Sequence, residues 1–105
     1  MTLTHRQQFA ELLNVEMNKW GLIQQGWDYD YNYNPGRRLG QCIYGEKLLV
    51  FQLPYVDANP IVEGGVLHNT IKHEIGHALA GPNTGHGAAW KSLALVVGYT
   101  PEACT

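Results

Sequence analysis

The chain has 105 residues, 45% of them hydrophobic, and a formal net charge of −2 at pH 7. This length fits one small domain, and the slight acidic excess gives no general attraction to nucleic acid or to an anionic membrane. No apolar run approaches the roughly 20 residues of a membrane span, and the polar, amphipathic start "MTLTHRQQFAELL" is unlike a secretory signal.

The first half of the chain predicts one helix followed by three strands. Apolar residues in "THRQQFAELLNVEMNKWG" follow helical spacing, and Gly21 suits the C-terminal cap. From Trp27 to Tyr33 aromatic residues alternate with Asp and Asn, which predicts a strand with one aromatic face and one polar face. "NPGRR" is typical of a turn. "LGQCIYGEKLLVFQLPYV" predicts two short strands in a hairpin around Gly45-Glu46.

The second half predicts two helices. "DANP" has the features of a helix start, but Gly64-Gly65 weakens this part, so the firm helix begins nearer Val66 and ends at Gly81-Pro82. "AAWKSLALVVG" predicts a last helix that stops at Gly98. The order of helix, three strands, helix and helix is that of an α+β fold.

The helix from Val66 carries the motif "HEIGH", residues 73–77. With His73 at 0° on a helical wheel, His77 lies at about 40° and Glu74 at about 100°. The two imidazoles therefore share one side of the helix and can reach one zinc ion at about 2.0–2.1 Å, while Glu74 is better placed to hold a water. The opposite face is apolar and predicts core contacts for Leu67, Ile71, Ile75, Ala78 and Leu79. His68 falls within this apolar face and is expected to be a packed or capping histidine.

A catalytic zinc needs a third protein ligand and one open position. Two candidates follow the helix, His86 in "NTGHG" and Glu102 close to the C-terminus. The glycines on both sides of His86 permit a close approach of the backbone to a metal, whereas a rigid ligand is hard to hold four residues from a chain end. We therefore prefer His86. The two cysteines, Cys42 and Cys104, have no metal-like spacing, and we expect two free thiols in a reducing compartment.

The segment "TIKHEIGHALAGPNTGHGAAWK" resembles the SprT-like zinc metallopeptidase family, which includes the Spartan-type proteases. His73, Glu74, His77, the triplet around His86 and Trp90 match the family pattern position by position. Upstream, "RRLGQCIYGEKLLVFQL" is similar to the family's strand pair before the active-site helix. The resemblance implies a minimal zincin-like protease domain that occupies residues 1–105, without the C-terminal zinc ribbon that many members carry.

Together, the motif and the resemblance predict an endopeptidase with one Zn²⁺ per chain. In this interpretation His73, His77 and His86 hold the zinc, which lowers the pKa of its bound water, and Glu74 is the catalytic base that accepts the water's proton. The substrate is expected to be a protein or peptide, and we expect a cytoplasmic protein, of a cell or of a virus-infected host. The alternative is a non-catalytic, zinc-stabilised module that binds a protein or DNA partner, in which Glu102 or Cys104 fills the fourth position.

Spartan-type relatives imply an association with DNA, but the charges of this chain argue for weak binding. Seven Lys and Arg residues stand against nine acids, and only Arg37-Arg38 form a pair. The aromatic series Trp27, Tyr29, Tyr31 and Tyr33 is the one plausible base-stacking surface. Because aspartates alternate with it, core packing is the preferred interpretation.

Overall fold

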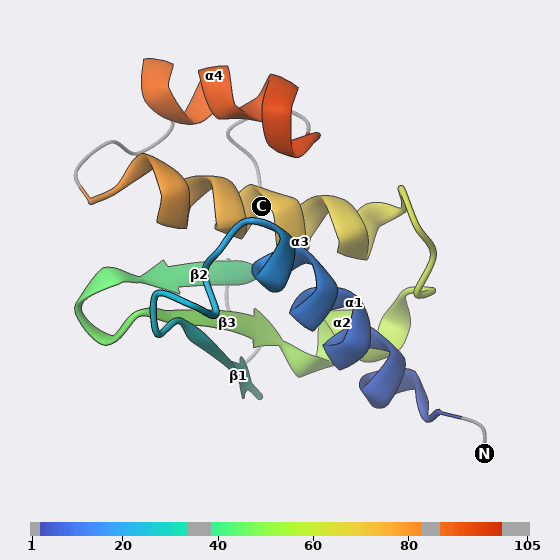
Figure 1. Ribbon diagram of the computed structural model, residues 1–105. Coiled ribbons are helices and arrows are strands. Elements are labelled where there is room, and N and C mark those ends of the chain that lie inside the picture. Colours follow the sequence, from blue (N-terminus) through green and yellow to red (C-terminus); the bar gives the residue numbers. More distant parts are fainter. Residues whose placement is uncertain (1–2, 34–38, 83–86, 100–105) are drawn as a thin grey trace.

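The computed structural model describes residues 3–33, 39–82 and 87–99 (Figure 1). It has the predicted α+β class, with four α-helices and a small three-stranded sheet. In chain order the elements are α1 (His5–Lys19), β1 (Asp28–Asn32), β2 (Gly40–Ile43), a single 3-10 turn η1 (Tyr44–Glu46), β3 (Leu48–Gln52), α2 (Leu53–Ala58), α3 (Val66–Ala80) and α4 (Ala88–Val97). None of the helices in the described ranges is long and apolar enough to cross a membrane.

Local signals account for both ends of α1. The Thr4 side chain accepts a hydrogen bond from the backbone of Gln7, and the Gln7 side chain accepts one from the backbone of Thr4, which completes a capping box. The helix ends at Lys19, and Gly21 follows with a positive φ of 77°. Glycine adopts this conformation without a steric penalty, so the predicted stop is confirmed within a residue or two.

The sheet has the strand order β1-β3-β2. β2 and β3 are antiparallel neighbours joined through η1, which confirms the predicted hairpin. β1 pairs in parallel with β3, so the first strand lies beside the last one and not beside its neighbour in sequence. This order leaves β1 and β2 as the two edges of the sheet.

The aromatic residues Trp27, Tyr29 and Tyr31 face the core. Core packing, the interpretation preferred over base stacking, is thus confirmed for these three. Tyr29 and Tyr31 lie in register with Leu49 and Phe51 of β3 and pack against the buried cluster together with Trp27. The alternate residues Asp28 and Asp30 are exposed. Tyr33, beyond the strand, differs from the others because 69% of its surface is exposed.

The sequence pattern does not predict helix α2 (Leu53–Ala58), because the apolar run "LLVFQLPYV" suits a strand to its end. Pro54 lies in the first turn of α2, a position where its missing N–H costs no hydrogen bond. Leu53 and Val56 of this short helix are buried. The expected helix start at "DANP" is also wrong, since Asp57 and Ala58 are the last residues of α2, but α3 does begin at Val66.

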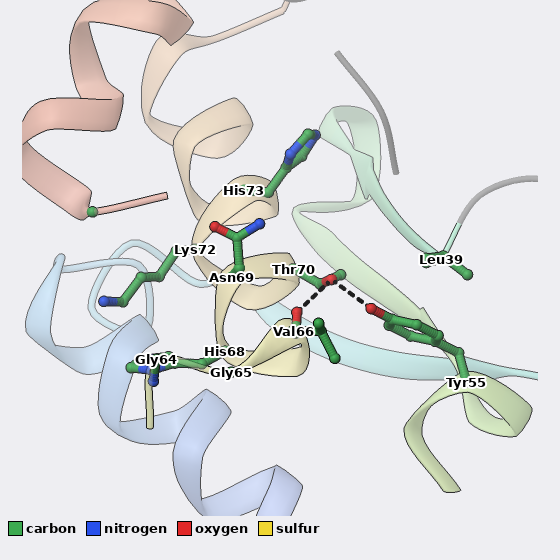
Figure 2. A pocket seen from close by; sticks show the side chains of 11 residues that line it. Leu39, Tyr55, Gly64, Gly65, Val66, His68, Asn69, Thr70, Lys72 and His73 are labelled. Carbon is green, nitrogen blue, oxygen red and sulfur yellow. Dashed lines mark hydrogen bonds between the residues drawn. The ribbon is translucent and has the colours of Figure 1, made fainter. Parts of the chain in front are cut away.

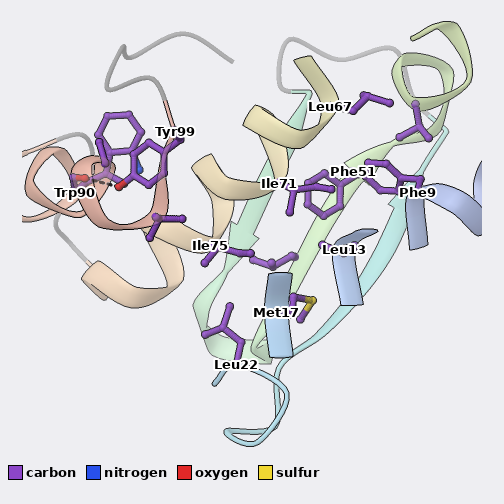
Figure 3. Close-up of a cluster of buried hydrophobic side chains, with 14 of the residues drawn as sticks. Phe9, Leu13, Met17, Leu22, Phe51, Leu67, Ile71, Ile75, Trp90 and Tyr99 are labelled. Carbon is purple, nitrogen blue, oxygen red and sulfur yellow. Dashed lines mark hydrogen bonds between the residues drawn. The ribbon is translucent and has the colours of Figure 1, made fainter. Parts of the chain in front are cut away.

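Helices α1 and α3 cover the same face of the sheet, and α4 packs on the far side of α3 (Figures 1 and 3). Phe9 of α1 meets Phe51 of β3 edge to face, with ring centroids 5.4 Å apart. The predicted core residues Leu67, Ile71 and Ile75 of α3 are buried, and Ala78 and Leu79 are half-buried against the same cluster. Helix α3 is therefore the central element, in contact with the sheet, α1 and α4.

His68 of α3 is a packed histidine, as expected. Its Nε2 lies 3.1 Å from a carboxylate oxygen of the buried Glu16 of α1, and its Nδ1 accepts the backbone N–H of Gly64 at 2.8 Å. Because Nδ1 accepts a hydrogen bond, the ring hydrogen sits on Nε2 and points at Glu16. This pair links α1 to the start of α3 and leaves His68 no role as a metal ligand.

Candidate metal centre

His73 and His77 lie one turn apart on α3, on the side that the helical wheel predicted. His73 is 3% exposed and His77 is half-buried. Their ring centroids are 5.0 Å apart, with an interplanar angle of 61°. Two imidazoles that bind one tetrahedral zinc at about 2.0–2.1 Å have ring centres about 5 Å apart, so the spacing of these two rings fits a shared zinc ion.

Trp90 of α4 packs against both imidazoles. Its ring stacks on His77 at 5.2 Å and 18°, and it meets His73 edge to face at 4.7 Å. Its indole N–H also donates to the backbone carbonyl of His73, at 3.3 Å. The fully buried indole thus limits the rotation of both rings and ties α4 to the motif. The Tyr44 hydroxyl of η1 donates to the carbonyl of His77 at 2.9 Å and anchors the other side of the helix.

Glu74 points toward the sheet and lies under β2. It is 2% exposed, and a Cβ added at Gly40 would meet the Glu74 side chain at 2.9 Å from Cγ and 3.0 Å from Oε2. Only glycine therefore lets β2 approach the carboxylate this closely. Cys42 lies on the same strand face as Gly40; burial, and then the charge of Glu74, raises the pKa of the Cys42 thiol to about 12, so this thiol is neutral at physiological pH.

Gly76, which directly precedes His77 in the motif, is also required by packing. A Cβ at this position would overlap the ring of Tyr99, which follows α4. The Tyr99 ring stacks on Trp90 with centroids 4.9 Å apart, and its hydroxyl donates to the Trp90 carbonyl. Burial raises the pKa of Tyr99 to about 12, so the hydroxyl stays protonated as a donor. Gly76 thus gives Trp90 and Tyr99 room to pack on α3.

Neither candidate for a third ligand lies among the residues that the structure describes. Both sequence candidates, His86 and Glu102, lie outside these residues, as do Cys104 and the Arg37-Arg38 pair. Within residues 3–33, 39–82 and 87–99, no group of three or more His, Cys, Asp or Glu side chains is arranged to hold a metal. Of the three predicted ligands, the described residues therefore include His73 and His77, and His86 stays the predicted third ligand.

A groove runs from His73 toward the start of α3 (Figure 2). Its volume is about 580 Å³, within the usual range for ligand pockets. Val66, Asn69 and Thr70 of α3 line it, with Tyr55 on one side and Lys72 on the other. Sequence reasoning did not identify this groove, nor the positioning contacts of Gly40, Tyr44 and Tyr99, because all of them arise between elements distant in sequence.

Gly76→Ala should destabilise the fold. The added methyl overlaps the Tyr99 ring, and overpacking of this kind costs about 1–3 kcal/mol, which outweighs the gain of about 1 kcal/mol in helix propensity. Gly45→Ala in the hairpin is the control, because nothing lies within 4 Å of its added Cβ. Urea denaturation should show a lower midpoint for Gly76→Ala and an unchanged one for Gly45→Ala. Equal midpoints for Gly76→Ala and the parent would refute this packing.

Comparison with known proteins places the chain in one family. The model of the SprT-like family matches residues 6–105, which is nearly the whole chain. No curated protein and no solved structure matches it. The matched range includes all of β2, α3 and α4, the elements that position the two imidazoles, Glu74 and Trp90. On this match, in agreement with the resemblance of its motif, the chain belongs to the SprT-like family.

Proposed function

We propose that this protein is a zinc-dependent endopeptidase. The observation that carries the proposal is the arrangement on α3, where two imidazoles 5.0 Å apart share one side and a buried glutamate lies beside them. Membership of the SprT-like family supports a metallopeptidase type of domain. A purely structural zinc site has no need of a buried carboxylate next to its ligands, which favours catalysis over the non-catalytic alternative.

The donor set fits zinc. His73 and His77 supply two neutral nitrogen ligands, and His86 is proposed as the third, which leaves one position open. When bound there, zinc would lower the pKa of a water molecule and polarise the carbonyl of the scissile peptide. The carbonyl groups of His73 and His77 accept hydrogen bonds from Trp90 and Tyr44, so the backbone behind each ligand is fixed.

Glu74 is proposed as the general base. Its carboxylate accepts a proton from the attacking water and then donates that proton to the leaving amine of the cleaved peptide. The approach of β2 at Gly40 restricts the carboxylate to one side of α3. A base held in this way needs little reorganisation before each proton transfer.

The outer edge of β2, which pairs with no further strand among the described residues, is proposed to align the substrate. The N–H of Gln52 in β3 donates to the carbonyl of Leu39 at 3.0 Å. Because hydrogen bonding alternates along an antiparallel ladder, the backbone groups of Gly40 and Cys42 point away from β3. These groups can pair with an extended polypeptide, and Gly40 lies directly over Glu74. An added strand would therefore bring a peptide bond close to the base.

DNA association is proposed to be weak, since several cations of the described chain are engaged elsewhere. Arg6 forms a two-bonded ion pair with Asp57, at 2.8 and 3.1 Å. Lys47 donates to the carbonyl of Gln25, and Lys19 lies over the ring of Trp20. Non-specific affinity for DNA requires several cations that neutralise phosphates together. Action on DNA-associated proteins would then depend on the protein substrate more than on the DNA.

Protein purified without chelator should contain about one zinc per chain. His86→Ala should lose most of this zinc, because two imidazoles alone bind the ion weakly, while Glu102→Ala should retain it. Elemental analysis of the parent and both variants is the measurement. Zinc retained in His86→Ala and lost in Glu102→Ala would show that the third ligand is assigned wrongly.

Glu74→Gln should keep its zinc and its melting temperature but cleave reduced casein at least about 100-fold more slowly. The amide preserves the shape of the side chain and removes the basic carboxylate, so only the proton transfers are lost. Zinc content and thermal unfolding are measured on the same preparations. Cleavage at the parental rate would eliminate the catalytic role of Glu74 and favour the non-catalytic zinc module.

Gly40→Ala should reduce cleavage with the zinc content intact. The added methyl meets the flexible end of Glu74, so the carboxylate moves and the fold adapts at low cost. A displacement of about 1 Å at a reacting group can cost up to about 100-fold in rate. Gly45→Ala, in the same hairpin with nothing within 4 Å of the added Cβ, is the matched control. Parental activity in Gly40→Ala would show that this contact does not position the base.

A further inference from the structure

The groove beside His73 has one charged wall. Val66, Asn69 and Thr70 form its floor, and Tyr55 stands on one side with its hydroxyl 3.5 Å from that of Thr70 (Figure 2). The Thr70 hydroxyl itself donates to the Val66 carbonyl, at 3.0 Å. The opposite side carries Lys72. The groove thus presents hydroxyl, amide and ammonium groups beside apolar side chains, and His73 lies at the end that adjoins the candidate metal centre.

Lys72 gives this groove a positive charge. Among the described residues that line it, Lys72 is the one Lys or Arg and there is no Asp or Glu. His68 also borders the groove, but its ring is occupied by Glu16 and by the backbone of Gly64. Within the described ranges no carboxylate forms an ion pair with Lys72. A cationic wall in a chain of net charge −2 favours an anionic group of the ligand.

The Lys72 ammonium lies against the end of α4. A Cβ at Gly98 would come within 3.3 Å of its Nζ, and Gly98 has a φ of 96° that favours glycine. The bare backbone at this position leaves space around the ammonium group. Lys72 also directly precedes His73 in the chain, so its charge sits close to the place where the scissile bond is proposed to lie.

We propose that this groove holds the substrate polypeptide next to the scissile bond and that Lys72 selects an acidic side chain there. The inference rests on the proposed peptidase function, because it takes His73 to be a ligand of the catalytic zinc. A volume of about 580 Å³ accommodates side chains of an extended peptide. Lys72 is therefore a specificity-determining residue, and Asp or Glu close to the cleaved bond should favour binding.

A nucleic acid is the less favoured occupant. A phosphate would also accept a hydrogen bond from Lys72, but DNA binding draws its affinity from several neutralised phosphates. The described lining of the groove offers one lysine, and the wall opposite this lysine carries Tyr55 and Leu39. A carboxylate side chain of a peptide needs only one cation, so the observed charge matches a peptide better.

Binding and cleavage are measured separately to test the inference. Zinc-loaded Glu74→Gln is titrated with two fluorescein-labelled pools of 12-residue peptides, identical except that one is enriched in Asp and Glu and the other in Lys and Arg. Fluorescence anisotropy should show about fivefold tighter binding of the acidic pool, the size expected for one partly exposed charge pair. Adding Lys72→Gln should abolish the preference, and Lys72→Glu should reverse it.

Lys91→Glu is the charge-matched control, because Lys91 lies exposed on α4 and does not line the groove. It should keep the acidic preference. Lys72 near the end of α4 would also interact favourably with the last carbonyls of that helix. If this were its sole role, Lys72→Glu would lower the melting temperature and leave the relative affinity for the two pools unchanged. That result would overturn the inference.

Two further outcomes separate the inference from the proposed function. In the first, the protein with Glu74 intact cleaves neither pool, but its preference for the acidic pool depends on Lys72. This result would support the peptide-binding groove and reject the peptidase function. Cleavage of both pools at equal rates, with no difference in binding, would keep the peptidase and overturn the role of Lys72. Direct binding of a labelled 20-nucleotide single-stranded DNA that is tighter than that of the acidic pool, and that is lost in Lys72→Gln, would overturn the peptide assignment.

Discussion

The packing of Trp90 against the imidazoles of α3 is the contact on which the candidate centre depends. It joins the last helix to the motif, limits the rotation of both rings and gives the His73 carbonyl a donor. Tyr99 in turn stacks on the indole. Since an aromatic cluster of this kind has few alternative arrangements, it fixes the imidazoles before any metal binds. A metal site built on fixed ligands loses less conformational entropy on binding.

Two glycines allow the elements around α3 to approach it this closely. Gly76 gives room to Tyr99 on the α4 side, and Gly40 gives room to Glu74 on the sheet side. Helix α3 thus carries three functions on different sides, with apolar residues toward the core, imidazoles toward α4 and the carboxylate toward β2. The outer edge of β2 and the groove at Lys72 meet at this helix, so substrate alignment, selection and proton transfer are proposed to converge there.

Much of the fold and part of the centre could be predicted from sequence, because these features depend on local rules. Helical periodicity placed α1, α3 and α4 and put both histidines of the motif on one side, and a turn signal around Gly45 placed the hairpin. The prediction failed at α2, where the same apolar residues suit a strand or a short helix. Pro54 was the available signal, since it is favoured in the first turn of a helix and disfavoured within a strand.

The sequence by itself determined the family, the fold class and the position of both motif histidines on one side of a helix, since residue type and spacing along the chain decide these. The tertiary structure alone decided that β1 pairs in parallel with β3, that Gly40 lies over Glu74 and that Lys72 faces a groove beside His73. Each of these joins residues far apart in the chain, and the energy of such contacts comes from shape and burial between elements. Spacing along the sequence carries no record of that complementarity.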